Sequence, residues 1–228
     1  MDTRRWTEAV EADGRELGRL CRARPDAVVE SCPDWTGADL LAHAAGFCRT
    51  LGELFAGGRD AREPAVEVRR DDALASYDDD LAALLRLLAT TDPAAPVVNW
   101  SVRADDAAYW YRRAAHEFAI HRWDAATTAD GEPAPVPADL ARDGVAEFFE
   151  AFVATAFGYG RMPSKDATVV LELTDLDETL RYDLPNPGEE TVLRGTASDV
   201  VLALWHRRDP LALHTGGDAT LLRSWPHI

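Results

Sequence analysis

The stretch 112–124 carries two histidines and a glutamate at spacings that could support metal chemistry. Glu117 and His121 are four residues apart. Each helical residue advances by about 100°, so their side chains lie only about 40° apart, on a stripe that also carries apolar residues. Burying ionisable groups on such a stripe is costly unless they are paired. The spacing therefore predicts either two ligands for a divalent metal ion or a hydrogen bond between imidazole and carboxylate.

The motif of the zinc proteases is excluded at this stretch. That motif places two histidines four residues apart on one helix face. Here His116 and His121 are five residues apart, which separates them by roughly 140° around a helix. We therefore expect His116 not to be a ligand.

His43 is a candidate third ligand. Apolar residues recur at helical spacing over 39–54, and His43 lies within that stripe. Two helices would then turn polar side chains toward one shared core. Three ligands with nitrogen and oxygen donors leave a coordination position open on zinc, as catalytic sites require. The alternative is a metal-free polar network in which Glu117 is hydrogen-bonded to His43 or His121.

The charge balance of the 228-residue chain excludes several classes of partner. Aspartate and glutamate total 40 against 24 lysines and arginines, which gives a net charge of -16. Such a chain repels nucleic-acid phosphates and anionic lipid head groups, so we expect neither partner.

No apolar run approaches the ~20 residues of a membrane span, and the first residues lack the apolar run of a signal peptide. Three cysteines without a Cys-x-x-Cys pair predict reduced thiols. We expect a cytoplasmic protein.

Periodicity predicts helices first and a mixed region later in the chain. Apolar spacing indicates helices at about 3–23, 36–57, 71–90, 105–129 and 138–158. Residues 31–35 are expected to form a turn, after which Thr36 and Asp39 match a capping box. Later segments predict strands at 167–173, 178–184 and 191–194, a helix from Thr196 through Arg207 and a short strand at about 211–214. This order predicts the α+β class. We expect two domains, over residues 1–160 and 161–228.

Five motifs resemble those of the mycothiol-dependent maleylpyruvate isomerase family, almost from end to end of the chain. They are Cys32-Pro33-Asp34-Trp35-Thr36, Asp39-Leu40-Leu41-Ala42-His43, His116-Glu117 with His121-Arg122-Trp123-Asp124, Gly195-Thr196-Ala197-Ser198-Asp199 with Leu202-Ala203-Leu204-Trp205, and Gly217-Asp218. The resemblance implies a DinB-like four-helix bundle joined to a small C-terminal α/β module. It also implies a divalent metal, usually zinc, whose ligands here would be His43, Glu117 and His121.

The resemblance further implies an enzyme that uses mycothiol as a cosubstrate with a small electrophilic substrate. Metal coordination deprotonates a thiol near neutral pH, and the thiolate can add to an activated double bond, allow rotation and leave again. With an epoxide or a leaving group, the same thiolate would give a stable conjugate. Isomerisation and S-transfer both stay open, because the family contains both. The alternative is a metal- or small-ligand-binding module without thiol-dependent turnover.

Arg207, within Trp205-His206-Arg207, is expected to hold an anionic group of substrate or thiol. The resemblance motivates this role, and a chain of net charge -16 needs a local cation to bind a carboxylate. The alternative is that Arg207 and Arg208 only favour the negative end of their helix. Family members commonly have glycine before this arginine, so the bulkier His206 is expected to narrow or alter its surroundings. Trp35 is expected to pack in the core or an interface rather than to contact substrate.

Overall fold

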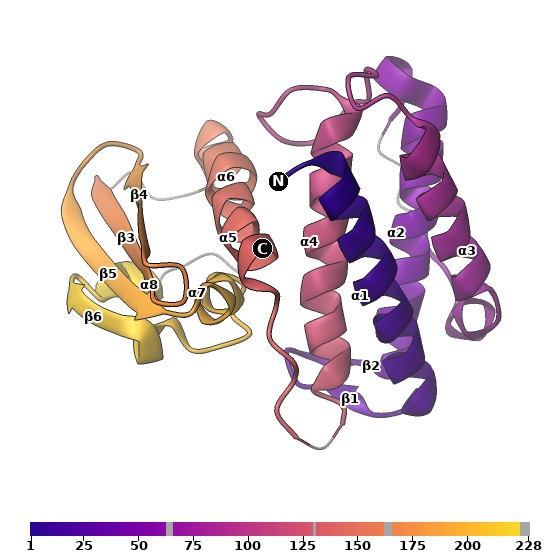
Figure 1. Cartoon of the computed structure of the whole chain (residues 1–228), viewed down its shortest axis with the longest axis horizontal. Helices are drawn as coiled ribbons and strands as arrows, with labels where there is room; N and C mark the ends of the chain where they lie inside the picture. Colours follow the sequence, from indigo (N-terminus) through magenta and orange to yellow (C-terminus); the bar gives the residue numbers. More distant parts are fainter. Residues whose placement is uncertain (63–65, 130, 162–165, 224–228) are drawn as a thin grey trace. The chain divides into compact units, whose positions relative to one another are not determined.

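Four long helices form the N-terminal part of the chain in the computed structural model (Figure 1). They are α1 (Thr3–Ala23), α2 (Gly37–Gly57), α3 (Arg70–Thr90) and α4 (Ala107–Ala126). The apolar stripe of each helix is buried, with α1 packed on α4 and α2 on α3. A short 3-10 turn, η1 (Gly58–Asp60), follows α2. The predicted four-helix bundle is confirmed.

The structure describes residues 1–62, 66–129, 131–161 and 166–223. The chain divides into two compact units, Met1–Ala134 and Pro135–Ile228. Across the described ranges, we find no helix with the length and apolar character needed to cross a bilayer.

A small hairpin precedes α2 where the sequence predicted only a turn. Strands β1 (Val28–Val29) and β2 (Cys32–Thr36) pair antiparallel, with Val28 opposite Thr36. The turn prediction for 31–35 was wrong because this pairing depends on residues upstream of the segment. The capping box is confirmed, since the Thr36 hydroxyl and the Asp39 carboxylate each bond to the other's backbone N–H. This box fixes where α2, the helix that carries His43, begins.

The second unit combines a broken helix with a four-stranded sheet. The helical run consists of α5 (Ala138–Glu147), the π-helical turn η2 (Phe148–Val153) and α6 (Ala154–Gly158). The sheet has the order β4-β3-β5-β6, formed by β3 (Ala167–Leu173), β4 (Glu178–Leu184), β5 (Glu189–Gly195) and β6 (His214–Gly217). Strand β3 runs antiparallel to β4 and parallel to β5. The α+β class is confirmed.

The division between the units differs from the predicted boundary after residue 160. Helix α5 packs against α7 (Ala197–Leu204), and the Val136 N–H donates to Ser198 Oγ at 3.0 Å. Arg142 of α5 forms an ion pair with Glu178 of β4 at 2.6 Å. These contacts assign the helix predicted at 138–158 to the C-terminal unit, which corrects the sequence-based boundary.

Helix α7 ends at Leu204, three residues before the predicted end at Arg207. His206 adopts a left-handed conformation with φ of 57°. Its N–H bonds to the Ala203 carbonyl at 3.1 Å, and the Arg207 N–H bonds to the Leu202 carbonyl at 2.8 Å. This is the Schellman pattern of helix termination, which most often has glycine at the left-handed residue. Arg207 therefore follows the helix rather than lying on it.

The end of the chain also departs from the predicted pattern in detail. The expected strand at 211–214 is mostly the 3-10 turn η3 (Pro210–Leu213), and β6 begins at its end. A short helix, α8 (Thr220–Arg223), comes last among the described residues. The strand was misplaced because β6 is specified by pairing with β5, with Thr191 opposite Gly217.

Candidate metal centre

The three predicted ligand residues meet inside the helical bundle. His43 lies on α2, and Glu117 and His121 lie one turn apart on α4. Each offers one ligand atom, and these atoms all lie within 4.8 Å of one another. His43 Nε2 is 2.8 Å from Glu117 Oε1, and His121 Nε2 is 3.2 Å from the same oxygen. Both imidazoles therefore converge on one carboxylate oxygen.

A buried carboxylate orients His121 from behind. Nδ1 of His121 donates to Asp124 Oδ2 at 2.9 Å, and Ser31 Oγ donates to Asp124 Oδ1 at 2.6 Å. Asp124 is fully buried. A hydrogen bond at Nδ1 leaves Nε2 as the nitrogen that faces the cluster, which is how metal-binding histidines are usually held. The spacing of three residues could have revealed Asp124, whereas Ser31 lies 93 residues from it in the chain.

Arg113 holds the other oxygen of the glutamate. Its Nη2 lies 3.0 Å from Glu117 Oε2, and its side chain is only 5% exposed. This bond occupies Oε2 and leaves Oε1 directed toward the two histidines. Arg113 precedes Glu117 by four residues, so the helical spacing carried a signal for the pair that the sequence-based prediction missed.

The cluster favours positive charge at its centre. Burial alone would raise the pKa of Glu117, but the charge of His121 and hydrogen bonds from His121 and His43 hold it well below its usual range. Burial alone would lower the pKa of His121, but Glu117 and Asp124 raise it to about 9. The carboxylate thus stays ionised and holds a proton on His121, at the point where a metal ion could replace it.

The donor set matches that of open zinc sites. Two imidazole nitrogens and one carboxylate oxygen are the ligands of several catalytic zinc sites. Ligand atoms about 2 Å from a tetrahedral ion lie roughly 3.3 Å from one another. The distances of 2.8 and 3.2 Å from Glu117 Oε1 to the two histidine nitrogens are close to that value. The donor types and these two distances therefore suit a zinc ion, and all three ligand atoms lie within 4.8 Å of one another.

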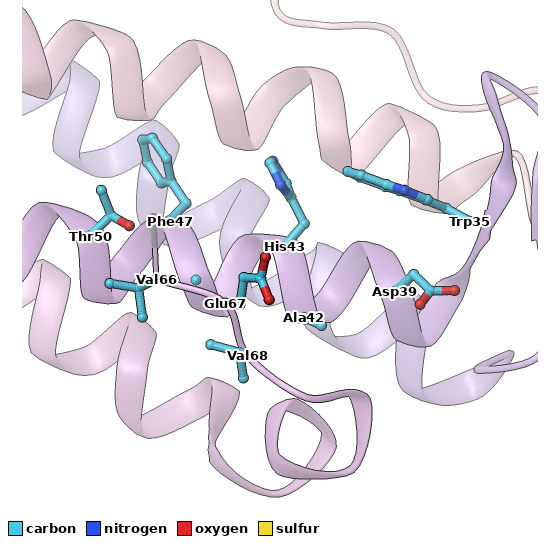
Figure 2. A pocket seen from close by; sticks show the side chains of 10 residues that line it. Trp35, Asp39, Ala42, His43, Phe47, Thr50, Val66, Glu67 and Val68 are labelled. Carbon is cyan, nitrogen blue, oxygen red and sulfur yellow. The ribbon is translucent and has the colours of Figure 1, made fainter. Parts of the chain in front are cut away.

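A pocket of about 490 Å³ opens beside His43 (Figure 2). Its described walls consist of Trp35, Asp39, Ala42, His43, Gly46, Phe47, Thr50, Val66, Glu67 and Val68. The His43 side chain is 37% exposed, against 12% for His121, so the cluster is more accessible from the His43 side. Trp35 lies on this wall with its ring 5.0 Å from that of His43. Trp35 is half-buried and lies at the pocket rather than in the core, because the hairpin carries it there. That it packs rather than contacts substrate stays a prediction.

Arg207 belongs to the C-terminal unit. Its Nη1 donates to the Trp205 carbonyl at 2.8 Å, close to the end of α7. The neighbouring Arg208 is paired with Asp199 at 3.1 Å. Asp199 lies in the first turn of α7, so the pair joins the two ends of this short helix.

Both units match models of one protein family. Residues 6–126 match the mycothiol maleylpyruvate isomerase N-terminal domain, and residues 139–224 match the corresponding C-terminal domain. No curated protein matches the sequence. One crystal structure of the mycothiol-dependent maleylpyruvate isomerase is 17% identical, with a TM-score of 0.65, and the match covers 91% of this chain and 90% of that one.

A second crystal structure, of a histidine-to-alanine mutant of the mycothiol-dependent maleylpyruvate isomerase, is 16% identical with a TM-score of 0.67. The match covers 94% of this chain and 92% of that one. The TM-scores of the two structures show a shared fold, and the two domain models together span nearly the whole sequence. The chain therefore belongs to the mycothiol maleylpyruvate isomerase family.

Proposed function

We propose that this protein is an enzyme that holds a divalent ion, zinc, at His43, Glu117 and His121 and uses it with mycothiol to act on a small electrophile. The observation that carries the proposal is the convergence of two imidazole nitrogens on one oxygen of Glu117 beside an open pocket. Family membership supports the choice of thiol. The reaction is cis–trans isomerisation of a double bond in the electrophile. For electrophiles that form a stable bond to the thiol sulfur, the reaction is S-transfer.

The chain's own residues have two tasks in this reaction. Asp124 keeps Nε2 of His121 directed to the ligand cluster, and Arg113 keeps Oε1 of Glu117 directed there as well, where these residues would hold the ion. When bound, zinc supplies a Lewis acid that lowers the pKa of a thiol to near neutrality. The pocket beside His43 gives the thiol a path to the ligand cluster.

The isomerisation balances without any further reactant. The thiolate sulfur forms a bond to one carbon of a double bond conjugated to a carbonyl, and the π electrons move to the carbonyl oxygen. Rotation follows about the resulting carbon–carbon single bond. The electron pair then returns, the double bond re-forms, and the carbon–sulfur bond breaks to release the thiolate. We further propose that Arg207 binds an anionic group of the electrophile, because arginine can bind a carboxylate through two hydrogen bonds.

Metal content tests the ligand assignment. We expect wild-type protein to bind about one zinc ion per chain and the variants Glu117→Gln and His43→Ala to lose most of it. Glu117→Gln keeps the side-chain shape, and circular dichroism verifies that both variants are helical. Glu53→Gln is the matched control, since Glu53 is an exposed residue of α2 away from the cluster. Full metal occupancy in both ligand variants would overturn the assignment.

Cobalt substitution tests the role of the thiol. A thiolate that enters the coordination sphere of cobalt produces charge-transfer bands. We expect such bands on adding mycothiol to the cobalt-loaded protein and none with an S-methylated analogue. An unchanged spectrum at saturating mycothiol would exclude thiol activation at this site.

A further inference from the structure

The pocket beside His43 is bounded on one side by a segment far from it in sequence, residues 66–68. This segment lies directly on α2 at Gly46. A Cβ atom at Gly46 would come within 2.5 Å of the Val66 carbonyl oxygen, so the glycine permits the close approach. The segment contributes Val66, Glu67 and Val68 to the pocket wall (Figure 2). The pocket therefore has a definite wall whose chemistry can select a ligand.

The described wall carries acidic side chains but no basic ones. Its ionisable residues are Asp39, His43 and Glu67, and none of its described residues is a lysine or arginine. Asp39 is already engaged, as the cap of α2 and in an ion pair with Arg70. Glu67 is exposed, and no described residue pairs with its carboxylate. An anionic group that entered beside His43 would thus meet an uncompensated negative charge.

The other wall residues suit an uncharged group with both carbon and hydroxyl surface. Phe47, Val66 and Val68 offer apolar contact, and the half-buried Trp35 adds an aromatic face. Thr50 adds a hydroxyl group, and the Glu67 carboxylate is a strong acceptor for hydroxyl donors. Pockets of this kind bind through apolar area and use a few polar groups for orientation.

We propose that this pocket binds the uncharged, hydroxyl-bearing part of the thiol cosubstrate and that Glu67 excludes thiols that carry a carboxylate. This inference rests on the function proposed above, and it names the ligand class of the same site. Glu67 then acts as a specificity residue. It accepts hydrogen bonds from hydroxyl groups of the thiol and repels anionic thiols, so anionic substrate groups must be bound elsewhere.

Two small thiols of opposite character test the selectivity. We would measure dissociation constants of thioglycerol, a neutral diol, and mercaptopropionate, an anion, on cobalt-loaded protein from the charge-transfer bands. We expect Glu67→Gln to tighten binding of mercaptopropionate and to weaken binding of thioglycerol. Removing the negative charge of Glu67 from the pocket wall should change the ratio of the two dissociation constants by about three- to tenfold at low salt. Glu8→Gln carries the same charge change at an exposed position of α1 outside the pocket and should leave the ratio unchanged.

A ratio that Glu67→Gln leaves unchanged, or that both variants change equally, would overturn the inference. The metal content of the same samples reports separately on the proposed function.

A second experiment needs no metal. Thr50→Cys in a Cys32→Ser background places a thiol in the pocket wall, and its rate of modification is measured with cationic and anionic methanethiosulfonates of matched size.

We expect the cationic reagent to react faster in this background and Glu67→Gln to reduce the rate ratio by about threefold or more. Glu8→Gln, which removes an exposed carboxylate on α1, should not reduce it. If the rate ratio responds while no metal binds, the pocket assignment stands and the metal-dependent function fails. If metal binds and the rate ratio does not respond, the pocket assignment fails alone.

Discussion

Asp124 accepts the Nδ1 hydrogen of His121 at 2.9 Å from a position that is fully inaccessible to solvent. Ser31 donates to its second oxygen from the hairpin before α2. The carboxylate is thus held from both sides and sets which nitrogen of His121 faces the ligand cluster. The hydrogen bond between Ser31 and Asp124 therefore connects the hairpin before α2 to the last turns of α4, and both residues support the candidate metal site.

We expect Asp124→Asn to weaken zinc binding by about 10- to 100-fold, the usual range when the partner of a metal-binding histidine is altered. Ser31→Ala should have a smaller effect in the same direction, because Asp124 keeps its bond to His121. Competition with a chromophoric chelator measures both affinities. Asp34→Asn, at an exposed position of β2, is the control. Zinc affinity equal to that of wild type in Asp124→Asn would show that the contact is only structural.

Arg207→Lys should weaken turnover or ligand affinity while leaving metal content unchanged. Lysine keeps the charge but loses the paired donors that bind a carboxylate. Thermal stability should change by no more than about 0.5 kcal/mol, as for most surface substitutions. Arg208→Lys is the matched comparison, because Arg208 is paired with Asp199. A lysine variant at position 207 with full activity would reduce Arg207 to a charge at the helix end.

His206→Gly should raise the free energy of unfolding by up to about 1 kcal/mol, because glycine adopts the left-handed conformation without a steric penalty. His206→Ala should not stabilise the protein, since alanine keeps the penalty at a φ of 57°. Urea denaturation compares the three proteins. Equal stabilisation by glycine and alanine would mean that the imidazole, and not the backbone conformation, is unfavourable here.

The protein's own thiols should be inert in the folded state at neutral pH. Burial raises the pKa of Cys21 to about 12 and raises that of Cys48 as well. The thiolate forms that react are therefore negligible at pH 8. We expect Ellman's reagent to modify only the half-buried Cys32 rapidly and all three cysteines in urea. In Cys32→Ser no fast phase should remain, and rapid modification of two thiols in the native protein would contradict the prediction.

Features that depend on local sequence were predictable. The helices of the bundle follow from apolar periodicity, and the start of α2 follows from the Thr36–Asp39 capping box. Each of these two features is specified within about one helix length of sequence, where periodicity and capping carry the information. Periodicity also placed His43 on one apolar stripe and Glu117 with His121 on another. The meeting of the two stripes depends on packing between residues 74 positions apart, and the family resemblance implied it.

Features that depend on distant partners were missed or misplaced. Pairing of Val28 with Thr36 makes a hairpin of an expected turn. The boundary between the two units lies after residue 134 because α5 packs on α7. These two helices are about 60 residues apart in the chain, and local periodicity does not predict contacts over that separation. The end of α7 was missed because a histidine, rather than the usual glycine, occupies its left-handed terminus.

All three candidate ligands, their supporting residues and the described pocket wall come from within Met1–Ala134. A recombination event that exchanged residues 135–228 would therefore transfer the entire ligand set intact. Under the proposed function, selection through the metal and the thiol would act on the first half of the gene, and the second half could diverge at a different rate. Differences among relatives in the electrophile that the thiolate attacks would then accumulate chiefly in the second half.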